Sequence, residues 1–497
     1  MADVHLEYVN SAFMRVHAEP SIMMEMGEHF TYFKQNYKFS PKFKAGIWDG
    51  KIRLLKGMTG LIYAGLTKKV KKFCDARGYT ISWDDEFYFE NVSVHEMKKF
   101  IKSLNIPEKF ETRDYQFDSV LKCIRSKRRT LISPTSSGKT LMMYMISRWY
   151  ENEKKLIIVP SVGLVRQAED DFRDFGYEGK IHCSTDGLSK DNDIDAEIVV
   201  TTWQSLNNGK TKMPKKWYQQ FGAVFGDEAH GAKATCLIEI MSNLTKCMYR
   251  FGTTGTLNND ELDNATIEGL FGPIYQATTT KELMDAGHVS QLLIKCLVLK
   301  YPEDVCKEFH KATYDPKKGS TRRKNYQEEV DFLKDFEKRN QFIKNLALSL
   351  DGNKLVFFRF IEQGEILNKI ISEDAEGNVF HIDGSVGGKE REAIRKAIED
   401  EENAVLIASL GTTSTGVSIN KLHHMIAASP TKSNIKLLQS IGRLLRKHDS
   451  KDQAVIYDIV DDLSYKSYKN YTLGHFAERA KIYDSEKFDY RIYNLEL

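Results

Sequence analysis

The chain has 497 residues, of which 41% are hydrophobic and 28% are charged. This length predicts about three domains with a core each, and the composition excludes a chain that is disordered overall. A net charge of +3 is nearly neutral, so total charge does not by itself indicate a nucleic-acid partner. No run approaches the roughly 20 apolar residues of a membrane span, and the first residues lack a signal-peptide pattern. We therefore expect a soluble, intracellular protein.

Residues 1–105 contain no nucleotide-binding motif and are predicted to form a small, basic α/β accessory domain, with a helix from Lys68 to Cys74. Between Lys34 and Lys72, eleven lysines or arginines accompany one acidic residue, Asp49, and aromatic residues are interleaved with them. Cations that neutralise phosphates beside rings that stack on bases favour nucleic-acid binding. The alternative is a solvated face over a small core. The candidate contacts are Lys42, Lys44, Trp48, Lys51, Arg53, Lys68, Lys69, Lys71 and Lys72.

Residues 106–288 have a different pattern, in which short apolar runs are separated by longer amphipathic stretches. The runs are TLIS, KLIIVP, EIVVTT, GAVFGDEAH and YRFGTTGT. Buried parallel strands that alternate with crossover helices produce this rhythm, so we predict a doubly wound parallel sheet. Ligands of such a sheet bind at the carboxyl ends of its strands.

A second set of apolar runs predicts another doubly wound sheet in residues 289–497, which ends in a C-terminal helix. Its runs are KLVFFRF, NVFHID, AVLIAS, HMIAAS and QAVIYDIV. The segment 313–329 is polar, basic and punctuated by glycine and proline, so we expect an exposed, mobile loop there. Its cations, Lys317, Lys318, Arg322, Arg323 and Lys324, are either phosphate contacts or a solvated face.

The loop SPTSSGKT (133–140) lies between a predicted strand and an apolar helix, which is the setting of a P-loop. Backbone amides at the start of such a helix bind phosphate oxygens. Lys139 is expected to meet the β- and γ-phosphates of ATP, and the Thr140 hydroxyl to bind Mg²⁺. The strict pattern has glycine in place of Ser133, so the loop is degenerate. The candidate nucleotide contacts are Pro134, Thr135, Ser136, Ser137, Gly138, Lys139 and Thr140.

GDEAH (226–230) ends an apolar strand, where a P-loop site places the carboxylate that holds its metal ion. Asp227 is expected to hold Mg²⁺, and Glu228 to orient and polarise the attacking water. The alternative is a pair of surface acids at a strand end. QSIGRLLR (439–446) places Arg443 and Arg446 on one helix face, where both are candidates to stabilise charge on the γ-phosphate. The alternative is a basic helix surface.

These segments together resemble the motif series of superfamily 2 helicases, from RDYQ (113–116) to QSIGRLLR. The resemblance implies an ATP-dependent motor with two RecA-like domains, in which Gln116 reads the adenine and Gly416 contacts the nucleotide. The sequence departs from the family at Ser136, usually glycine, and at Ser418, often acidic. The resemblance also implies coupling residues, His230, Thr254, Thr256 and Gln439, and nucleic-acid contacts, Arg166, Gln204 and Arg359.

Within that superfamily, the segment FSPKFKAGIWDGKIRLL (39–55) and the motif spacing are similar to the UvsW-type recombination and repair helicases of T-even phages. This resemblance implies a cytoplasmic protein of a phage-infected cell that remodels Holliday junctions, D-loops, R-loops and stalled forks in recombination, repair and replication. RNA in hybrids is a further expected partner. Three alternatives stay open: an RNA helicase, a duplex translocase that does not separate strands, and a non-catalytic ATP-gated clamp.

Overall fold

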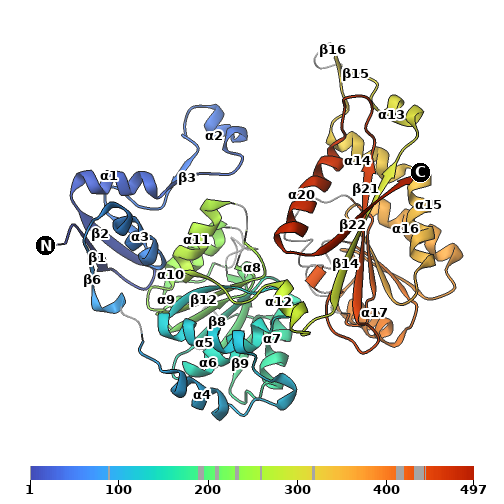
Figure 1. Ribbon diagram of the computed structural model, residues 1–497. Helices are drawn as coiled ribbons and strands as arrows, with labels where there is room; N and C mark the ends of the chain where they lie inside the picture. The colour runs from blue at the N-terminus through green and yellow to red at the C-terminus, as the bar shows by residue number, and fades with distance from the viewer. Residues whose placement is uncertain are drawn as a thin grey trace. The chain divides into compact units, whose positions relative to one another are not determined.

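The computed structural model describes residues 2–87, 90–188, 195–206, 212–229, 234–257, 260–315, 320–409, 419–429, 441–442 and 444–497 (Figure 1). The chain divides into two compact units, residues 1–278 and residues 279–497. The sequence pattern placed this boundary at residue 288. Among the described residues, no helix has both the length and the apolar character needed to cross a membrane.

The first unit begins with a small α/β domain built on a four-stranded sheet in the order β5-β2-β1-β6. Its elements are β1 (Val4–Tyr8), β2 (Phe13–Ala18), α1 (Pro20–His29), β5 (Leu61–Tyr63), α3 (Thr67–Arg77) and β6 (Ile81–Trp83). Alternate residues of β1 and β2 are buried against α1 and α3, which gives the domain its own core. The predicted accessory domain and its helix are therefore confirmed.

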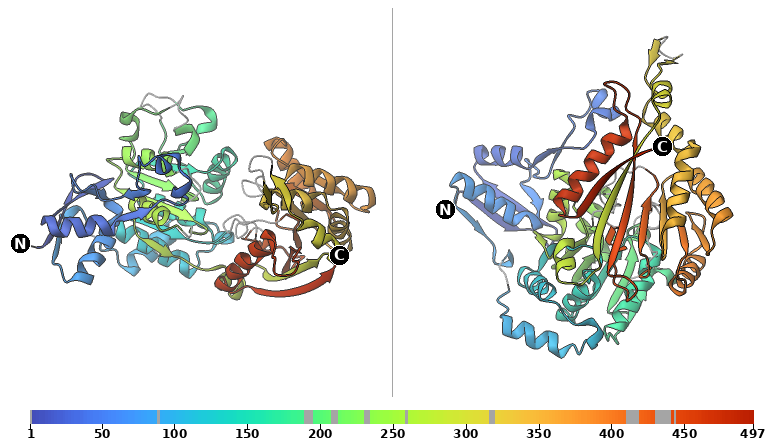
Figure 2. Two further views of the ribbon diagram at one scale, coloured as in Figure 1. Left: turned by 90° about the horizontal axis from the view of Figure 1, so that it is seen from above. Right: turned by 45° about the vertical axis from the view of Figure 1, so that its right-hand side comes forward.

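A separate two-stranded antiparallel pair, β3 (Thr31–Phe33) and β4 (Lys51–Arg53), extends from this domain. Between its strands lie η1 (Tyr37–Phe39) and α2 (Pro41–Lys44). Figure 1 and the right-hand view of Figure 2 show this segment projecting away from the four-stranded sheet. We call residues 31–53 the hairpin extension.

The small domain packs against α11 (Glu261–Phe271) of the following sheet at very close range. A Cβ built on Gly65 would lie 2.2 Å from the carbonyl oxygen of Glu268. Leu262 and Ala265 of α11 belong to the apolar core of the small domain, and Lys69 Nζ lies 3.1 Å from a carboxylate oxygen of Glu268. The small domain and the first large sheet are thus one packed body.

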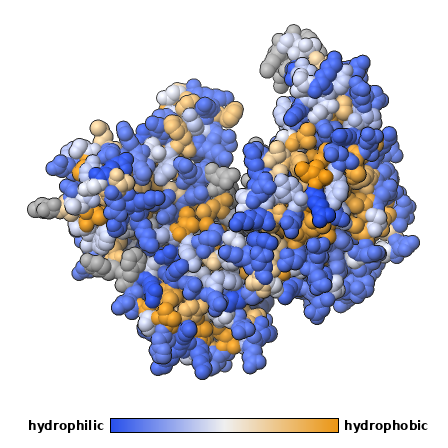
Figure 3. Space-filling view, in the orientation of Figure 1, coloured by the Kyte–Doolittle hydropathy of each residue, from blue (hydrophilic) through white to orange (hydrophobic). Residues whose placement is uncertain are grey.

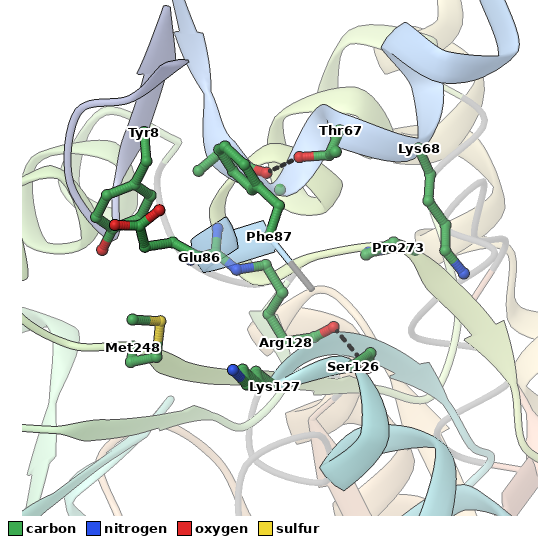
Figure 4. A pocket seen from close by; sticks show the side chains of 12 residues that line it. Tyr8, Thr67, Lys68, Glu86, Phe87, Ser126, Lys127, Arg128, Met248 and Pro273 are labelled. Carbon is green, nitrogen blue, oxygen red and sulfur yellow. Dashed lines mark hydrogen bonds between the residues drawn. The ribbon is translucent and has the colours of Figure 1, made fainter. Parts of the chain in front are cut away.

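A cavity of about 60 Å³ remains beside this contact (Figure 4). Arg128 reaches toward Glu86 and Phe87 in it and donates through Nη2 to the carbonyl oxygen of Ser11 at 2.8 Å. Its buried Nη1 has no hydrogen-bond partner among the described residues. Burial, with a smaller effect of Arg250, lowers the pKa of Arg128 to about 9. This guanidinium belongs to the packing between the two domains.

We expect Gly65→Ala to destabilise the first unit, because its methyl group would collide with backbone that cannot rotate away. Overpacking of this kind costs about 1–3 kcal/mol. Urea unfolding followed by tryptophan fluorescence measures the loss. Gly57→Ala is the control, since a Cβ there meets nothing within 4 Å. Equal midpoints for the two variants would show that the contact is looser than the structure has it.

The first seven-stranded sheet is parallel throughout, in the order β13-β7-β12-β11-β8-β10-β9. In β8, Ile157 and Val159 pack with α5, α6 and α7, whereas Leu156 and Ile158 pack with α10 and α11 on the other face. Burial on both faces explains the continuous apolar runs of the sequence.

The bounds of its strands are β7 (Arg128–Ile132), β8 (Lys155–Val159), β9 (Ile181–Cys183), β10 (Ile198–Thr202), β11 (Ala223–Gly226), β12 (Tyr249–Thr254) and β13 (Ile274–Gln276). The other helices are α4 (Val94–Ser103), α5 (Asp114–Ser126), α6 (Lys139–Trp149), α7 (Val162–Asp174), α8 (Trp203–Leu206), α9 (Lys215–Tyr218) and α10 (Ala234–Asn243).

The second unit contains another parallel seven-stranded sheet, in the order β18-β19-β17-β20-β21-β14-β22. Its strands are β14 (Gln291–Lys300), β17 (Lys354–Phe358), β18 (Val379–Ile382), β19 (Val405–Ser409), β20 (His424–Ala427), β21 (Gln453–Asp462) and β22 (Asp489–Glu496). Its helices are α12 (Thr280–Asp285), α13 (Glu303–Phe309), α14 (Tyr326–Asp335), α15 (Glu337–Ser349), α16 (Ile361–Asp374), α17 (Gly388–Asp400) and α20 (Tyr471–Ser485). The predicted fold class, two parallel α/β sheets after a small domain, is confirmed.

Two buried ion pairs attach helices to opposite faces of β21. Arg339 of α15 donates to both carboxylate oxygens of Asp461, at 2.7 and 3.0 Å, and neither side chain is exposed. Arg479 of α20 makes the same two-pronged contact with Asp458, at 2.9 Å for each bond. Residues three apart on a strand face opposite sides. Accordingly α15 and α20 lie on different faces of this sheet (Figure 2).

Two parts of the second unit differ from the sequence-based expectation. The segment 313–329 is not one loop: it contains β15 (Thr313–Asp315), β16 (Ser320–Arg322) and the start of α14. A capping box, in which Asn325 and Glu328 satisfy each other's backbone amides, begins that helix. The predicted C-terminal helix is present as α20, but the chain continues past it into the strand β22, which the sequence did not indicate because a mostly exposed edge strand carries no buried apolar run.

Candidate ATP site

The P-loop leaves the carboxyl end of β7 and enters α6, which begins at Lys139. Two residues of the loop adopt left-handed backbone, Ser136 at φ 68° and Gly138 at φ 76°. The Ser133 hydroxyl donates to the Ser137 hydroxyl at 2.6 Å, which in turn donates to the carbonyl oxygen of Pro134 at 2.7 Å. The serine in the first glycine position thus closes the loop through its side chain.

Two side chains from the start of α5 form hydrogen bonds to the P-loop. The Tyr115 hydroxyl and the Gln116 amide both donate to the carbonyl oxygen of Ser137, at 2.7 and 2.8 Å. A Cβ on Gly138 would lie 2.3 Å from Gln116 Nε2 and would push this amide off its hydrogen bond, and the left-handed backbone at Gly138 also favours glycine. The sequence-based prediction gave Gln116 a contact with adenine and missed Tyr115. The available signal was the position of Tyr115 next to Gln116 in the RDYQ motif.

The carboxyl ends of three adjacent strands bring together Lys139, Asp227 and Glu228, the predicted catalytic residues of the first unit. β12 lies between β7 and β11, so Lys139 and the DEAH segment flank it. Lys139 Nζ donates to Glu228 Oε1 at 2.9 Å, and both side chains are largely buried. Glu228 has a φ of 47°, a left-handed conformation that costs a residue with a side chain about 1–3 kcal/mol. Such strain is typical of sites where orientation matters.

The TTGT segment connects both acids to the P-loop. The Thr253 hydroxyl donates to Asp227 Oδ1 at 2.8 Å, and the Gly255 amide donates to Glu228 Oε2 at 3.3 Å. The amide of Ser133 donates to the carbonyl oxygen of Thr254 at 2.9 Å. One further bond stays inside the segment, where the Thr254 hydroxyl donates to the carbonyl oxygen of Thr256 at 2.7 Å. The buried Thr256 hydroxyl has no partner among the described residues.

The electrostatics of the site favour a cation beside Asp227. Burial, and next the neighbouring Glu228 carboxylate, raise the pKa of Asp227, while Lys139 and the Thr253 hydroxyl oppose the shift. A divalent cation would offset both costs. Asp227 and the Thr140 hydroxyl, in the first turn of α6, are hard oxygen donors of the kind that Mg²⁺ prefers. These residues fit the metal ion that a P-loop ATPase uses.

Four predicted residues lie outside the described part of the chain: His230, Gly416, Gln439 and Arg443. The same holds for Ser418. Arg446 is described and half-buried in the second unit, and its carbonyl oxygen accepts from the Ser290 hydroxyl at 3.5 Å.

Lys451, which no motif singled out, is a buried connector in the second unit. Its ammonium donates to the carbonyl oxygens of Asn420, Leu422 and Leu444, at 2.9, 2.7 and 2.7 Å. Burial lowers its pKa to about 8. These bonds fasten residues 420–422 to Leu444 of the QSIGRLLR segment. A lysine beyond the last motif gave no sequence signal for this role.

The three nucleic-acid candidates of the large sheets are partly accessible. Arg166 is in α7 and donates to Glu169 at 3.1 Å, and Gln204 is exposed on α8. Arg359 is exposed just after β17, where it donates to the Tyr326 hydroxyl at 3.3 Å.

The cations of the small domain fall into two groups. Lys42, Lys44, Lys51 and Arg53 lie in the hairpin extension with Trp48, whose indole donates to the carbonyl oxygen of Lys51 at 3.0 Å. Lys68, Lys69, Lys71 and Lys72 lie on α3. Two of that second group have carboxylate partners, since Lys69 pairs with Glu268 and Lys71 with Asp75.

The basic residues after β16 also contact the protein. Arg322 bonds both oxygens of Glu328, Arg323 lies 3.7 Å from the centre of the Tyr468 ring, and Lys324 donates to a main-chain carbonyl. Lys317 and Lys318 are outside the described residues.

Three family models match the chain: "DNA helicase UvsW, N-terminal" over residues 3–84, "Type III restriction enzyme, res subunit" over residues 109–259 and "Helicase conserved C-terminal domain" over residues 337–448. The ATP-dependent DNA helicase uvsW of Enterobacteria phage T4 is 34% identical over 512 residues, which cover 98% of each chain. The crystal structure of T4 UvsW matches with a TM-score of 0.50, 32% identity and 99% coverage of both chains. The DNA 3'-5' translocase XPB2 of Sulfurisphaera tokodaii is 25% identical over 430 residues, 78% of this chain and 94% of that protein.

A P-loop sheet followed in one chain by a second parallel sheet that matches the helicase C-terminal domain defines an ATP-dependent helicase of superfamily 2. The similarity to the T4 protein extends over nearly the entire chain and includes the N-terminal domain. The chain belongs to the UvsW family of ATP-dependent DNA helicases. The predicted family and enzyme class are confirmed, and the substrate is DNA.

Proposed function

We propose that this helicase remodels branched DNA, that is Holliday junctions, D-loops, R-loops and stalled forks, in recombination, repair and replication. The observation that carries the proposal is the packing of the small basic domain on α11. A duplex-binding domain that is fixed to the ATPase sheet cannot drift while the motor steps. A duplex arm is therefore held at a constant place relative to the strand that the motor pulls.

In this proposal the ATP site works with Mg²⁺. Lys139 and the amides of the P-loop hold the phosphates, and Thr140 and Asp227 hold the metal ion. Glu228 orients the attacking water, and Arg443 and Arg446 stabilise the charge that develops on the γ-phosphate. The bond between Lys139 and Glu228 supports these roles, because it gives both side chains one location at the strand ends.

A substrate panel tests the proposal. Forks, four-way junctions, D-loops, R-loops and a linear duplex of equal length are each scored for ATP-dependent conversion. Conversion of branched substrates above the linear duplex supports it. Stimulation of hydrolysis by RNA and not by forked DNA would favour the RNA helicase. The similarity to a protein named as a translocase favours, as the second candidate, movement on duplex without strand separation. Triplex displacement together with failed unwinding would identify that activity, and phosphate release over many turnovers would exclude an ATP-gated clamp.

Reversing two charges of the hairpin extension tests the DNA contact of the small domain. We expect Lys42→Glu with Lys44→Glu to weaken fork binding about tenfold or more at low salt and to reduce the salt slope of binding by about 2, because two phosphate contacts are lost. Both side chains are exposed, so folding should be unaffected. Lys215→Glu with Lys216→Glu, at the two exposed positions of α9 in the same unit, makes the same charge change elsewhere. An identical salt slope for both double variants would remove the hairpin extension from the DNA-binding surface.

A further inference from the structure

The hairpin extension is an ordered platform. The ring of Tyr37 is stacked on Phe33, with 4.9 Å between centroids, and meets the edge of Phe43 at 4.8 Å. Gly50 has a φ of 80°, and a Cβ there would lie 2.2 Å from the Tyr37 ring, so the chain returns directly under this ring. The Lys34 amide donates to the carbonyl oxygen of Gly50 at 2.9 Å. These contacts fix the shape of the projection without using the side chains of Phe39 and Ile47.

Three large apolar side chains of this platform face solvent. Phe39 is 75% exposed, Ile47 is 77% exposed and Phe33 is 54% exposed. Figure 3 shows apolar atoms on the projection beside hydrophilic ones. Single exposed apolar residues are ordinary, but three within one short projection indicate a contact surface, because covering them is favourable by about 25 cal/mol for each Å² removed from water.

Cations alternate with these apolar side chains along the hairpin extension. Lys34, Lys38, Lys42 and Lys44 lie in the same segment, and among the described residues none of the four has a carboxylate within ion-pair distance. Lys51 lies over the Phe33 ring at 5.2 Å from its centre. The one acid of the segment, Asp49, is bound to Arg53. The surface therefore suits a ligand that carries several negative charges and also presents flat apolar faces.

Unpaired nucleotides have this chemistry and paired nucleotides do not. In a duplex the base faces are stacked on one another, so a protein ring reaches only phosphates, sugars and edges. In a single strand, or where strands part, base faces are free to stack on an aromatic side chain. Lysines alone would suffice to hold a duplex, so the exposed Phe39 and Ile47 indicate a ligand with accessible base faces.

We propose that Phe39 and Ile47 bind unpaired bases where the strands of a branched DNA substrate part, while the surrounding lysines hold the adjoining phosphates. The inference rests on the proposed function, since it requires that the hairpin extension contacts DNA. It adds that the hairpin extension recognises the branch point through stacking. The projection then prefers a branch to an uninterrupted duplex before any ATP is spent.

The test replaces only the side chains that support no internal contact. Phe39→Ala with Ile47→Ala is compared with Met24→Ala with Met58→Ala, which removes apolar side chains that are 71% and 103% exposed elsewhere in the same domain. The probe is a fork with 2-aminopurine as the first unpaired base, and a fully paired duplex of equal length is the second ligand. Affinity and 2-aminopurine fluorescence are measured without ATP.

We expect the Phe39/Ile47 variant to bind the fork about tenfold more weakly, to bind the duplex within about twofold of the unaltered protein, and to lose the fluorescence change. Phe39→Trp, which keeps a stacking face, should retain fork preference. The methionine pair should change nothing. Unaltered fork binding, or an equal loss on fork and duplex, overturns the stacking inference.

The two double variants distinguish failure of the proposed function from failure of the stacking inference. If Lys42→Glu with Lys44→Glu leaves fork affinity unchanged, the hairpin extension does not contact DNA, and both ideas fall. If that variant loses affinity while Phe39→Ala with Ile47→Ala does not, only the stacking inference falls.

Discussion

Lys139→Ala is expected to lower kcat for ATP hydrolysis at least about 100- to 1000-fold while leaving DNA binding without nucleotide largely intact. The reason is twofold. The variant loses the cation that meets the β- and γ-phosphates, a loss of transition-state stabilisation of about 3–4 kcal/mol. It also removes the positive charge that now offsets the repulsion between the Asp227 and Glu228 carboxylates. DNA-stimulated phosphate release at saturating ATP measures the change.

Lys109→Ala is a matched control for that variant. Lys109 belongs to the same unit, is well exposed, and lies 3.8 Å from Asp174 in a surface pair that is worth little. The Lys109→Ala variant should hydrolyse ATP at the rate of the unaltered protein. A Lys139→Ala protein that turned over ATP at that rate would falsify the assignment of the nucleotide site.

Asp461→Asn should cost the second unit about 3–5 kcal/mol of unfolding free energy. The substitution leaves the Arg339 guanidinium buried without its counter-charge and weakens two bonds to it. It also alters the bond from the Tyr301 hydroxyl, which donates to Asp461 at 2.8 Å. One change therefore loosens α15, β21 and the end of β14 together. Arg395→Ala, which removes an exposed pair with Glu392, should cost less than about 1 kcal/mol.

The position of the tryptophans makes this measurement specific. All five tryptophans of the chain, residues 48, 83, 149, 203 and 217, lie in the first unit. Tryptophan fluorescence follows that unit, whereas far-ultraviolet circular dichroism follows both. Asp461→Asn should therefore create an early dichroism transition in urea that fluorescence does not follow. Coincident, unshifted transitions would mean that the ion pair carries little of the stability. Replacing both partners, as Arg339→Met with Asp461→Leu, should restore much of the loss.

The large sheets were predictable because parallel strands covered on both faces consist of continuous apolar runs. The alternation of Leu156 and Ile158 with Ile157 and Val159 between two cores is a direct example. The candidate ATP site was equally accessible to sequence reasoning, because a P-loop and a DEAH segment have fixed places at strand ends. The structure brings Lys139, Asp227 and Glu228 to that edge.

Other features had no local signal. The edge strand β22 is mostly exposed, and polar residues interrupt its aromatic and aliphatic ones, so it contains no buried apolar run. Some cations of the small domain are paired with acids that are distant in the sequence, as Lys69 is with Glu268, so the sequence alone did not reveal these partners. Lys451 donates only to main-chain carbonyl groups, which every residue possesses, so no sequence pattern marks its targets.

Lys451 uses all three of its N–H donors on backbone oxygens from two separate stretches of the second unit. A single nitrogen atom therefore holds residues 420–422 and Leu444 together. Displacing either stretch would strain the hydrogen bonds that Lys451 makes to the other, although Lys451 itself belongs to neither stretch.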